Sequence, residues 1–313
     1  MPRIVTLTLN PAIDVACVAP YVRPTHKIRS SGEQLDAGGG GINVARVIHT
    51  LGGDTLALVM TGGATGNLLE ALLEEAGVPW QALPIAGRNR ISMNVHDQES
   101  GLEYRFVPEG PTVERDEWVS ALTVLETIEA DWIVASGSLP PGVPADFYVR
   151  AAEIAARRGQ KFALDTSGAA LRAAASARIE LLKPSLGELA FLAGRPLPDP
   201  CSRDEEITLL LRAGAIRKVA VSLGAGGAVL GGPDGIIHSP AMPVEERGAV
   251  GAGDSFLAGL VLGFARGLPD RNALAFGMAA GAAAVATYGT ARVDREHVED
   301  LYWTWYQSQS DAV

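Results

Sequence analysis

Apolar, β-branched runs alternate with amphipathic segments along most of the chain. Helical periodicity is clearest in three stretches, Asn67–Ala76, Asp146–Arg157 and Glu205–Ala213. Short apolar runs predict buried strands at Ile4–Leu9, Thr55–Met60, Trp132–Ala135, Lys161–Leu164, Ile179–Leu182 and Val219–Leu223. This alternation predicts an α/β fold, a doubly wound and mostly parallel sheet with helices on both faces.

Two segments depart from the alternation. Residues 15–35 and 88–108 lack helical periodicity and predict short strands, and the second segment folds back as a hairpin at residues 97–101. Ligands of α/β sheets bind outside the carboxyl ends of the strands. We therefore expect one α/β domain over residues 1–313, with these segments inserted as a small β-strand lid over the edge that holds the site.

Composition and charge exclude several classes of protein. The formal net charge of −10 over 313 residues argues against general nucleic-acid binding. No apolar run reaches the roughly 18 residues of a membrane span, and residues 1–7 resemble a strand rather than a signal peptide. Cys17 and Cys201 lie far apart without zinc-ligand spacing. We expect a cytoplasmic protein with no nucleic-acid or membrane partner.

The segment 250–255, Val-Gly-Ala-Gly-Asp-Ser, precedes an apolar run with helical character. The free N–H groups of Gly251, Ala252 and Gly253 at a helix start can hold an anion and stabilise a transferring phosphoryl group. Asp254 stands beside that anion, where a carboxylate can take the proton of an attacking hydroxyl. The helix terminus should keep Asp254 ionised and weakly basic. A plain N-capping aspartate is the alternative interpretation.

A second glycine cluster, residues 38–41, opens a helix that contains Asn43. Glycine allows a ligand to approach the backbone, and the Asn43 amide can both donate to and accept from sugar hydroxyls. A dinucleotide fingerprint needs glycine where Asn43 stands and an acidic residue about twenty positions later, which is missing, so a Rossmann oxidoreductase is disfavoured. The chain has no Gly-Lys dipeptide and hence no Walker A loop.

Other strand ends carry weaker signals. Asp14 follows the first strand and could bind sugar hydroxyls or be a turn aspartate, and the turn around Ser138 supplies hydroxyls. Lys183 could meet a phosphate, and Glu188 could hold hydrated Mg²⁺. The glycine turn at residues 222–227 could bind phosphate oxygens through backbone amides. Each motif alone is common loop material.

Taken together and in order, these motifs resemble the phosphofructokinase B group of the ribokinase-like carbohydrate kinases over the whole chain. The matching segments are residues 10–14, 38–46, 136–142, 183–188, 222–227 and 250–255. The resemblance implies ATP-dependent, Mg²⁺-assisted phosphorylation of a sugar or sugar phosphate, with a monovalent cation such as K⁺ as an optional further cofactor. It also implies a lid that is often shared across a homodimer.

The resemblance assigns roles to these residues. Asp254 is the base and Glu188 the metal-binding carboxylate. The sugar would be held by Asp14, Gly39, Gly40, Asn43 and Ser138. The ATP phosphates would lie near Lys183, Ser185, Ser222, Gly224 and Gly227. Small residues of the late helix, Gly277, Gly281 and Ala284, would leave room for adenine. The family usually carries asparagine where this chain has Ser185, and the shorter serine leaves space for a water in the metal network.

The all-glycine segment before Asn43 resembles the minor-type 6-phosphofructokinases, since kinases of fructose 1-phosphate generally have Gly-Lys-Gly there. The expected substrate is fructose 6-phosphate, phosphorylated on its 1-hydroxyl. Arg90, Arg105 and Lys27 in the lid segments are expected to clamp its phosphate, although lid arginines are also common as solvated edge charges. A tagatose 6-phosphate kinase, a 1-phosphofructokinase and a non-catalytic sensor of sugar or nucleotide remain the alternatives.

Overall fold

The computed structural model describes residues 2–248, 250–287 and 292–310. Its main sheet has nine strands in the order β13-β12-β11-β10-β9-β8-β1-β4-β5, and a separate four-stranded sheet has the order β3-β2-β6-β7. The main-sheet strands are β1 (Arg3–Thr8), β4 (Asp54–Thr61), β5 (Trp80–Pro84), β8 (Trp132–Ser136), β9 (Lys161–Asp165), β10 (Ile179–Leu182), β11 (Ile216–Ser222), β12 (Ala228–Gly232) and β13 (Gly235–Ser239).

The main sheet is parallel from β5 to β11, and β12 and β13 pair antiparallel at its edge. The chain runs outward from β1 through β4 to β5 and then returns to β8 on the other side of β1. The sheet is therefore doubly wound, and its switch point lies between β1 and β8. The carboxyl ends of these two strands are where a ligand of such a sheet is expected to bind.

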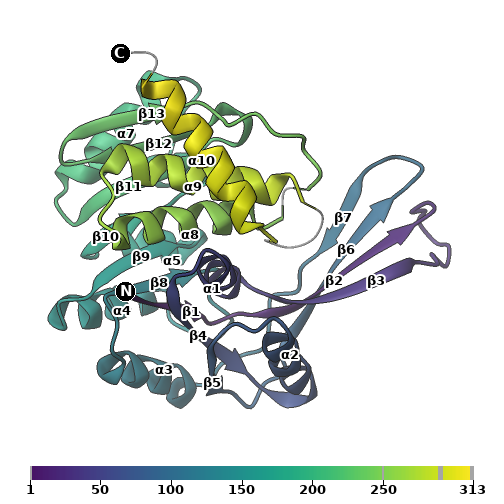
Figure 1. Cartoon of the computed structure of the whole chain (residues 1–313). Coiled ribbons are helices and arrows are strands. Elements are labelled where there is room, and N and C mark those ends of the chain that lie inside the picture. Colours follow the sequence, from purple (N-terminus) through teal and green to yellow (C-terminus); the bar gives the residue numbers. More distant parts are fainter. Residues whose placement is uncertain (1, 249, 288–291, 311–313) are drawn as a thin grey trace.

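Helices cover both faces of the main sheet (Figure 1). On one face lie α1 (Gly40–Thr50), α2 (Gly63–Glu75), α8 (Ala252–Ala265) and α9 (Asp270–Val285), with α10 (Arg295–Ser310) packed on α9. On the other face lie α3 (Arg115–Thr127), α4 (Phe147–Arg157), α5 (Gly168–Ala174), α6 (Leu186–Ala193) and α7 (Pro200–Arg212). Successive strand residues alternate between the two cores: Ile4 joins the α8 side and Val5 the other.

All six strands expected from the apolar runs are present, and the three expected helices correspond to α2, α4 and α7. The pattern of apolar runs did not predict β5, β12 and β13. Strand β5 lies at the edge of the sheet, only one of its five residues is buried, and it ends in Pro84. Strand β12 has the sequence AVLGG, whose two glycines lack the side-chain signal of a strand.

The second sheet is the predicted lid, and it projects from the main body (Figure 1). It comprises β2 (Ala12–Ala19), β3 (Ser31–Gly38), β6 (Arg90–Asp97) and β7 (Glu103–Phe106). The expected hairpin joins β6 to β7, where the Asp97 carboxylate accepts hydrogen bonds from the backbone N–H groups of Glu99 and Ser100. At the root of the lid, Val15 and Ala37 pack in one core with Leu69 and Leu73 of α2.

The first lid strand begins earlier than predicted. Strand β2 starts at Ala12 rather than residue 15, and β3 extends to Gly38. The lid thus continues directly from β1 into β2, and from β3 through Gly39 into α1. None of the described helices has the length and apolar character needed to cross a membrane.

Candidate active site

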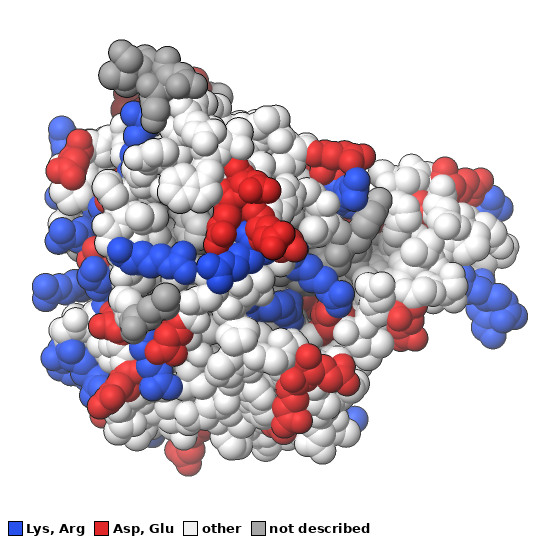
Figure 2. Space-filling model, in the orientation of Figure 1, with Lys and Arg blue, Asp and Glu red and all other residues white. Residues whose placement is uncertain are grey.

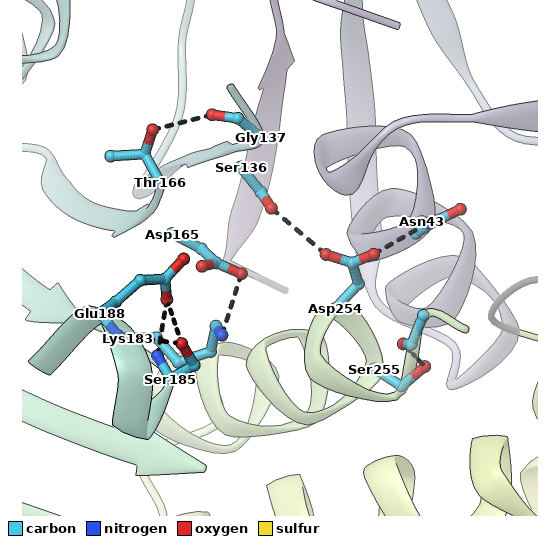
Figure 3. A network of polar contacts seen from close by, with 11 residues as sticks. Asn43, Ser136, Gly137, Asp165, Thr166, Lys183, Ser185, Glu188, Asp254 and Ser255 are labelled. Carbon is cyan, nitrogen blue, oxygen red and sulfur yellow. Dashed lines mark hydrogen bonds and ion pairs between the residues drawn. The ribbon is translucent and has the colours of Figure 1, made fainter. Parts of the chain in front are cut away.

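Three elements meet at the carboxylate of Asp254 (Figure 3). Gly251 has a left-handed conformation, with φ of 79°, and is the N-cap of α8, whose first turn contains Asp254. The Nδ2 atom of Asn43, on the first turn of α1, donates a 2.9 Å hydrogen bond to Asp254 Oδ2. The hydroxyl of Ser136, at the end of β8, donates to Oδ1 at 3.3 Å. Both oxygens of the expected base therefore have a fixed partner.

Burial raises the pKa of Asp254, and this shift is opposed by the hydrogen bond from Asn43 and by the charge of Lys183. We expected the helix terminus to make Asp254 a weak base, and this expectation is wrong in direction. Asp254 is half-buried, and the free energy of desolvating its charge exceeds the stabilisation by nearby donors. A raised pKa makes Asp254 a better proton acceptor.

The glycine cluster at the start of α1 makes room for polar side chains of the protein itself. A Cβ atom on Gly40 would overlap Ser136 Oγ and lie 3.1 Å from Asp254 Oδ1, and one on Gly38 would overlap the Asp14 carboxylate. Glycine at these two positions therefore lets the backbone approach Asp14, Ser136 and Asp254 closely.

Lys183 forms a buried ion pair with Asp165, with 3.1 Å between Nζ and Oδ2. Burial raises the pKa of Asp165 to about 6, and the neighbouring Lys183 opposes this shift. The motifs of the sequence did not single out Asp165. Its signal is its place as the last residue of β9, directly after the predicted strand Lys161–Leu164, at the same sheet edge as Ser136.

Ser185 and Glu188 form a capping box at the start of α6. The Ser185 backbone N–H and hydroxyl donate to the same Glu188 oxygen, Oε2, at 2.7 and 2.8 Å. In return, Ser185 Oγ accepts a 3.3 Å hydrogen bond from the Glu188 N–H. Serine in place of the family asparagine thus holds the carboxylate on the helix terminus.

One face of the lid lines a cavity of about 560 Å³. Asp14 lies in β2, in register with Ser92 of β6, and Arg105 of β7 is opposite Asn94. These four residues line the cavity, together with residues 246–248. Asp14 is therefore a strand residue and not the turn aspartate that we considered. Burial raises its pKa to about 6, against the opposing charges of Arg105 and Arg90.

The three expected clamp residues differ in their placement. Arg105 lines the cavity. The two terminal nitrogens of Arg90 each donate a 2.8 Å hydrogen bond to a backbone carbonyl, that of Asn10 before the lid and that of Pro108 after it. Lys27 is exposed in the segment between β2 and β3 and does not line the cavity of its own chain. Ser138 accepts a 3.2 Å hydrogen bond from Asn10 Nδ2.

The predicted phosphate-binding turn lies at the same edge of the sheet. Ser222 ends β11 and bridges to Ser185, and the short 3₁₀ turn Gly224–Gly226 follows it, closed by a hydrogen bond from the Leu223 N–H to the Gly227 carbonyl. The roles of Ser222, Gly224 and Gly227 toward ATP remain predictions.

The small residues of α9 have a packing role that the sequence did not show. A Cβ on Gly277 would come within 2.9 Å of the Phe256 carbonyl, and one on Gly281 would lie 3.3 Å from Phe256 Cβ. These glycines let α9 pack closely on α8. The expected role of Gly281 and Ala284 beside adenine remains a prediction.

Known proteins resemble this chain in sequence over nearly its whole length. The sequence profile of the pfkB family of carbohydrate kinases matches residues 7–296. The ATP-dependent 6-phosphofructokinase isozyme 2 of Mycobacterium tuberculosis is 42% identical over 306 residues, which cover 96% of this chain and 89% of that protein. The 1-phosphofructokinase of Rhodobacter capsulatus is 34% identical over 83% of each chain.

Phosphofructokinase-2 of Escherichia coli shares the fold in several solved structures. Its complex with potassium superposes with a TM-score of 0.94 at 36% identity, covering 98% of this chain and 100% of that one. Its complex with fructose-6-phosphate gives a TM-score of 0.91 at 35% identity, covering 97% and 99%. A tetrameric inhibited form gives 0.92 at 35% identity, covering 98% and 100%.

Proposed function

We propose a specific reaction for this chain, which belongs to the pfkB family of carbohydrate kinases and is an ATP-dependent sugar kinase. It transfers the γ-phosphoryl group of ATP to the 1-hydroxyl of fructose 6-phosphate, giving fructose 1,6-bisphosphate and ADP. The observation that carries this proposal is the half-buried Asp254 carboxylate, held by Asn43 and Ser136 at the N-terminus of α8, near a lid cavity that Arg105 lines.

In this reaction Asp254 accepts the proton of the 1-hydroxyl as that oxygen bonds to the γ-phosphorus, and the bond to the β–γ bridging oxygen breaks. Backbone N–H groups of Gly251, Ala252 and Gly253 stabilise the charge on the transferring group, because the start of α8 leaves them without helical acceptors. The raised pKa of Asp254 supports its role as proton acceptor.

The sugar phosphate would occupy the lid cavity. Asp14 accepts hydrogen bonds from sugar hydroxyls, with Gly39, Gly40, Asn43 and Ser138 as the further proposed contacts. Arg105 supplies a guanidinium fork for the 6-phosphate. Arg90 contributes from beside it, and Lys27 reaches the phosphate only from a partner subunit, because it lies outside the cavity of its own chain.

On the ATP side, Lys183 and the Ser222–Gly227 turn are placed to meet phosphates, and adenine would lie along α9. Glu188 and Asp165 offer the hard carboxylate oxygens that suit Mg²⁺, an ion that usually keeps several waters and binds through one or two carboxylates plus phosphates. Both Ser185 donors engage Glu188 Oε2, so Oε1 is the atom proposed to face a hydrated ion. When bound, Mg²⁺ neutralises charge on the phosphates. A monovalent cation such as K⁺ is a further proposed cofactor.

We propose a homodimer formed through the lid. The lid carries an apolar row, because the strand register aligns Leu35, Val15, Met93 and Phe106 across the sheet. Met93 is 43% and Phe106 59% exposed. Uncharged surface also predominates on the lid in Figure 2. A tetramer is the alternative, because one structure of the E. coli relative is tetrameric.

Sedimentation tests the lid interface. The parent protein should be a dimer, and the Phe106→Asp variant should be monomeric. A Phe106→Asp variant with the mass of the parent assembly would refute the lid interface.

The substrate assignment is tested by ADP release from Mg²⁺-ATP with fructose 6-phosphate, tagatose 6-phosphate, fructose 1-phosphate, ribose and adenosine. We expect the highest kcat/KM with fructose 6-phosphate. A preference for fructose 1-phosphate, the alternative raised by the name of the R. capsulatus relative, would replace the assignment. Binding without ADP release would identify a sensor. We place the enzyme in the cytoplasm, where both substrates are formed.

A further inference from the structure

We propose that Arg46 is a positioning residue for the base: its guanidinium fixes the side-chain amide of Asn43, and that amide fixes the carboxylate of Asp254. The inference rests on the proposed role of Asp254 in catalysis. Arg46 itself touches neither reacting atom, so its contribution passes through Asn43.

The three residues form a continuous chain of hydrogen bonds. Arg46 and Asn43 are three residues apart on α1 and therefore lie on the same face of the helix. The Arg46 Nη1 atom donates to Asn43 Oδ1 at 3.3 Å. Asn43 Nδ2 then donates to Asp254 Oδ2 at 2.9 Å. Asn43 is only 4% exposed, so water cannot readily replace either partner.

The two charges impose one orientation on the Asn43 amide. A guanidinium offers only donors, and a carboxylate offers only acceptors. With the observed orientation, the amide oxygen faces Arg46 and the NH₂ group faces Asp254. After a flip, NH₂ would face the guanidinium and the amide oxygen would face the carboxylate, so both hydrogen bonds would become repulsive contacts. Arg46 thereby keeps a hydrogen-bond donor directed at the base.

Arg46 is itself anchored to the lid. Its Nη2 atom donates a 2.5 Å hydrogen bond to the carbonyl of Ala37 in β3, just before the glycine turn that leads into α1. The guanidinium thus bridges the end of a lid strand and the helix that carries Asn43. Because Ser136 holds the other oxygen of Asp254, the hydrogen bonds from Arg46 through Asn43 complete the restraint on rotation of this carboxylate.

Arg46 is also close to acidic groups of the lid and to the base. Its charge interacts with Asp36, Asp14 and Asp254. Asp36 has a second cationic partner, Arg292, at 2.7 Å, whereas Asp14 faces the sugar cavity. Removal of the Arg46 charge should therefore affect sugar binding as well as turnover, and the test must separate these effects.

The test compares Arg46→Met, Asn43→Ala and the double variant, with kcat and both KM values measured for each. We expect Arg46→Met to lower kcat about 10–100-fold, a scale set by misplacement of a catalytic group, with the KM for ATP within about twofold. The double variant should have nearly the kcat of Asn43→Ala, because Arg46 acts through Asn43. Multiplicative losses in the double variant would overturn the proposal.

Arg157→Met is the matched control, since it removes an exposed arginine of α4 whose partner Glu126 lies in α3, on the face of the main sheet opposite α1. Its kcat should equal that of the parent. If Arg46→Met does not fold by circular dichroism, Arg46→Lys replaces it. An ammonium cannot reach both Asn43 and Ala37, so at least about a fivefold loss of kcat is expected. A parent-like kcat in either Arg46 variant refutes the inference. Absence of kinase activity in the parent would instead refute the proposed function.

Discussion

Lys183 Nζ lies 3.1 Å from Asp165 Oδ2, and these two groups form an ion pair. The lysine side chain is only 5% exposed. Removal of one partner of such a pair leaves an uncompensated buried charge. Asp165→Ala should therefore lower the free energy of unfolding by about 3–5 kcal/mol, measured by urea denaturation. Arg157→Ala, which breaks an ion pair with side chains 62% and 56% exposed, should cost at most about 1 kcal/mol. Equal losses of unfolding free energy in the two variants would show that the Lys183–Asp165 pair stabilises the fold no more than an exposed pair does.

Asp254→Asn tests the base. The amide has nearly the shape of the carboxylate but accepts no proton, so turnover should fall about 10²–10⁴-fold while ATP binding stays nearly intact. Single-turnover kinetics and ATP titration would measure the two effects. Turnover within a few-fold of the parent would show that another group takes the proton.

Glu188→Gln tests metal use. A neutral side chain at the start of α6 should raise the Mg²⁺ concentration needed for the half-maximal rate, because a hydrated divalent ion loses a charged acceptor.

Ser185→Asn should keep or improve activity, since asparagine can also cap α6. A large loss in Ser185→Asn would show that the paired bonds from Ser185 to Glu188 Oε2 are specific to serine.

Arg105→Ala and Arg90→Ala should behave differently. Each should raise the KM for fructose 6-phosphate at least about tenfold, because a charge-assisted hydrogen bond contributes roughly 1.5–3 kcal/mol. Arg90→Ala should also lower Tm, since it frees the carbonyls of Asn10 and Pro108 at the two ends of the lid. Arg29→Ala, on an exposed part of the lid, is the control. An unchanged KM for fructose 6-phosphate in both variants would refute the proposal that Arg90 and Arg105 bind its phosphate.

Asp14→Asn should stabilise the free protein while weakening sugar binding. Burial raises the folded-state pKa of Asp14 from 3.8 to about 6, so the folded state holds this proton more tightly than the unfolded chain does. Stability from this group therefore falls as pH rises through about 6, and ionised Asp14 destabilises the protein at pH 7. The variant should gain on the order of 3 kcal/mol at about pH 7.

The pH dependence of that gain provides the check. The difference in Tm between Asp14→Asn and the parent should shrink as pH falls from 6 toward 3.8, the range between the folded and unfolded pKa values. Glu33→Gln, at an exposed carboxylate of β3, is the control for removal of a lid carboxylate. A lower Tm for Asp14→Asn at pH 7 would mean that the carboxylate is held by favourable contacts.

The six central strands and the order of the motifs at their ends could be predicted from local residue patterns. Buried parallel strands need continuous apolar, β-branched runs, and each run lies within a few neighbouring residues. Because the carboxyl ends of parallel strands meet at one edge, the strand pattern alone places Ser136 and Lys183 at the same side of the sheet. The lid could be predicted in the same way, from the loss of helical periodicity.

The contacts between side chains across that edge could not be predicted, because they depend on how distant parts of the chain pack together. Asn43 and Asp254 are 211 residues apart and form a hydrogen bond, Lys183 pairs with Asp165, and Arg90 engages two backbone carbonyls. The direction of the Asp254 pKa shift depends on how completely several elements bury the carboxylate. The burial of a side chain results from all the elements that pack around it, and these elements are distant from one another in the sequence. A local pattern of residues therefore does not reveal it.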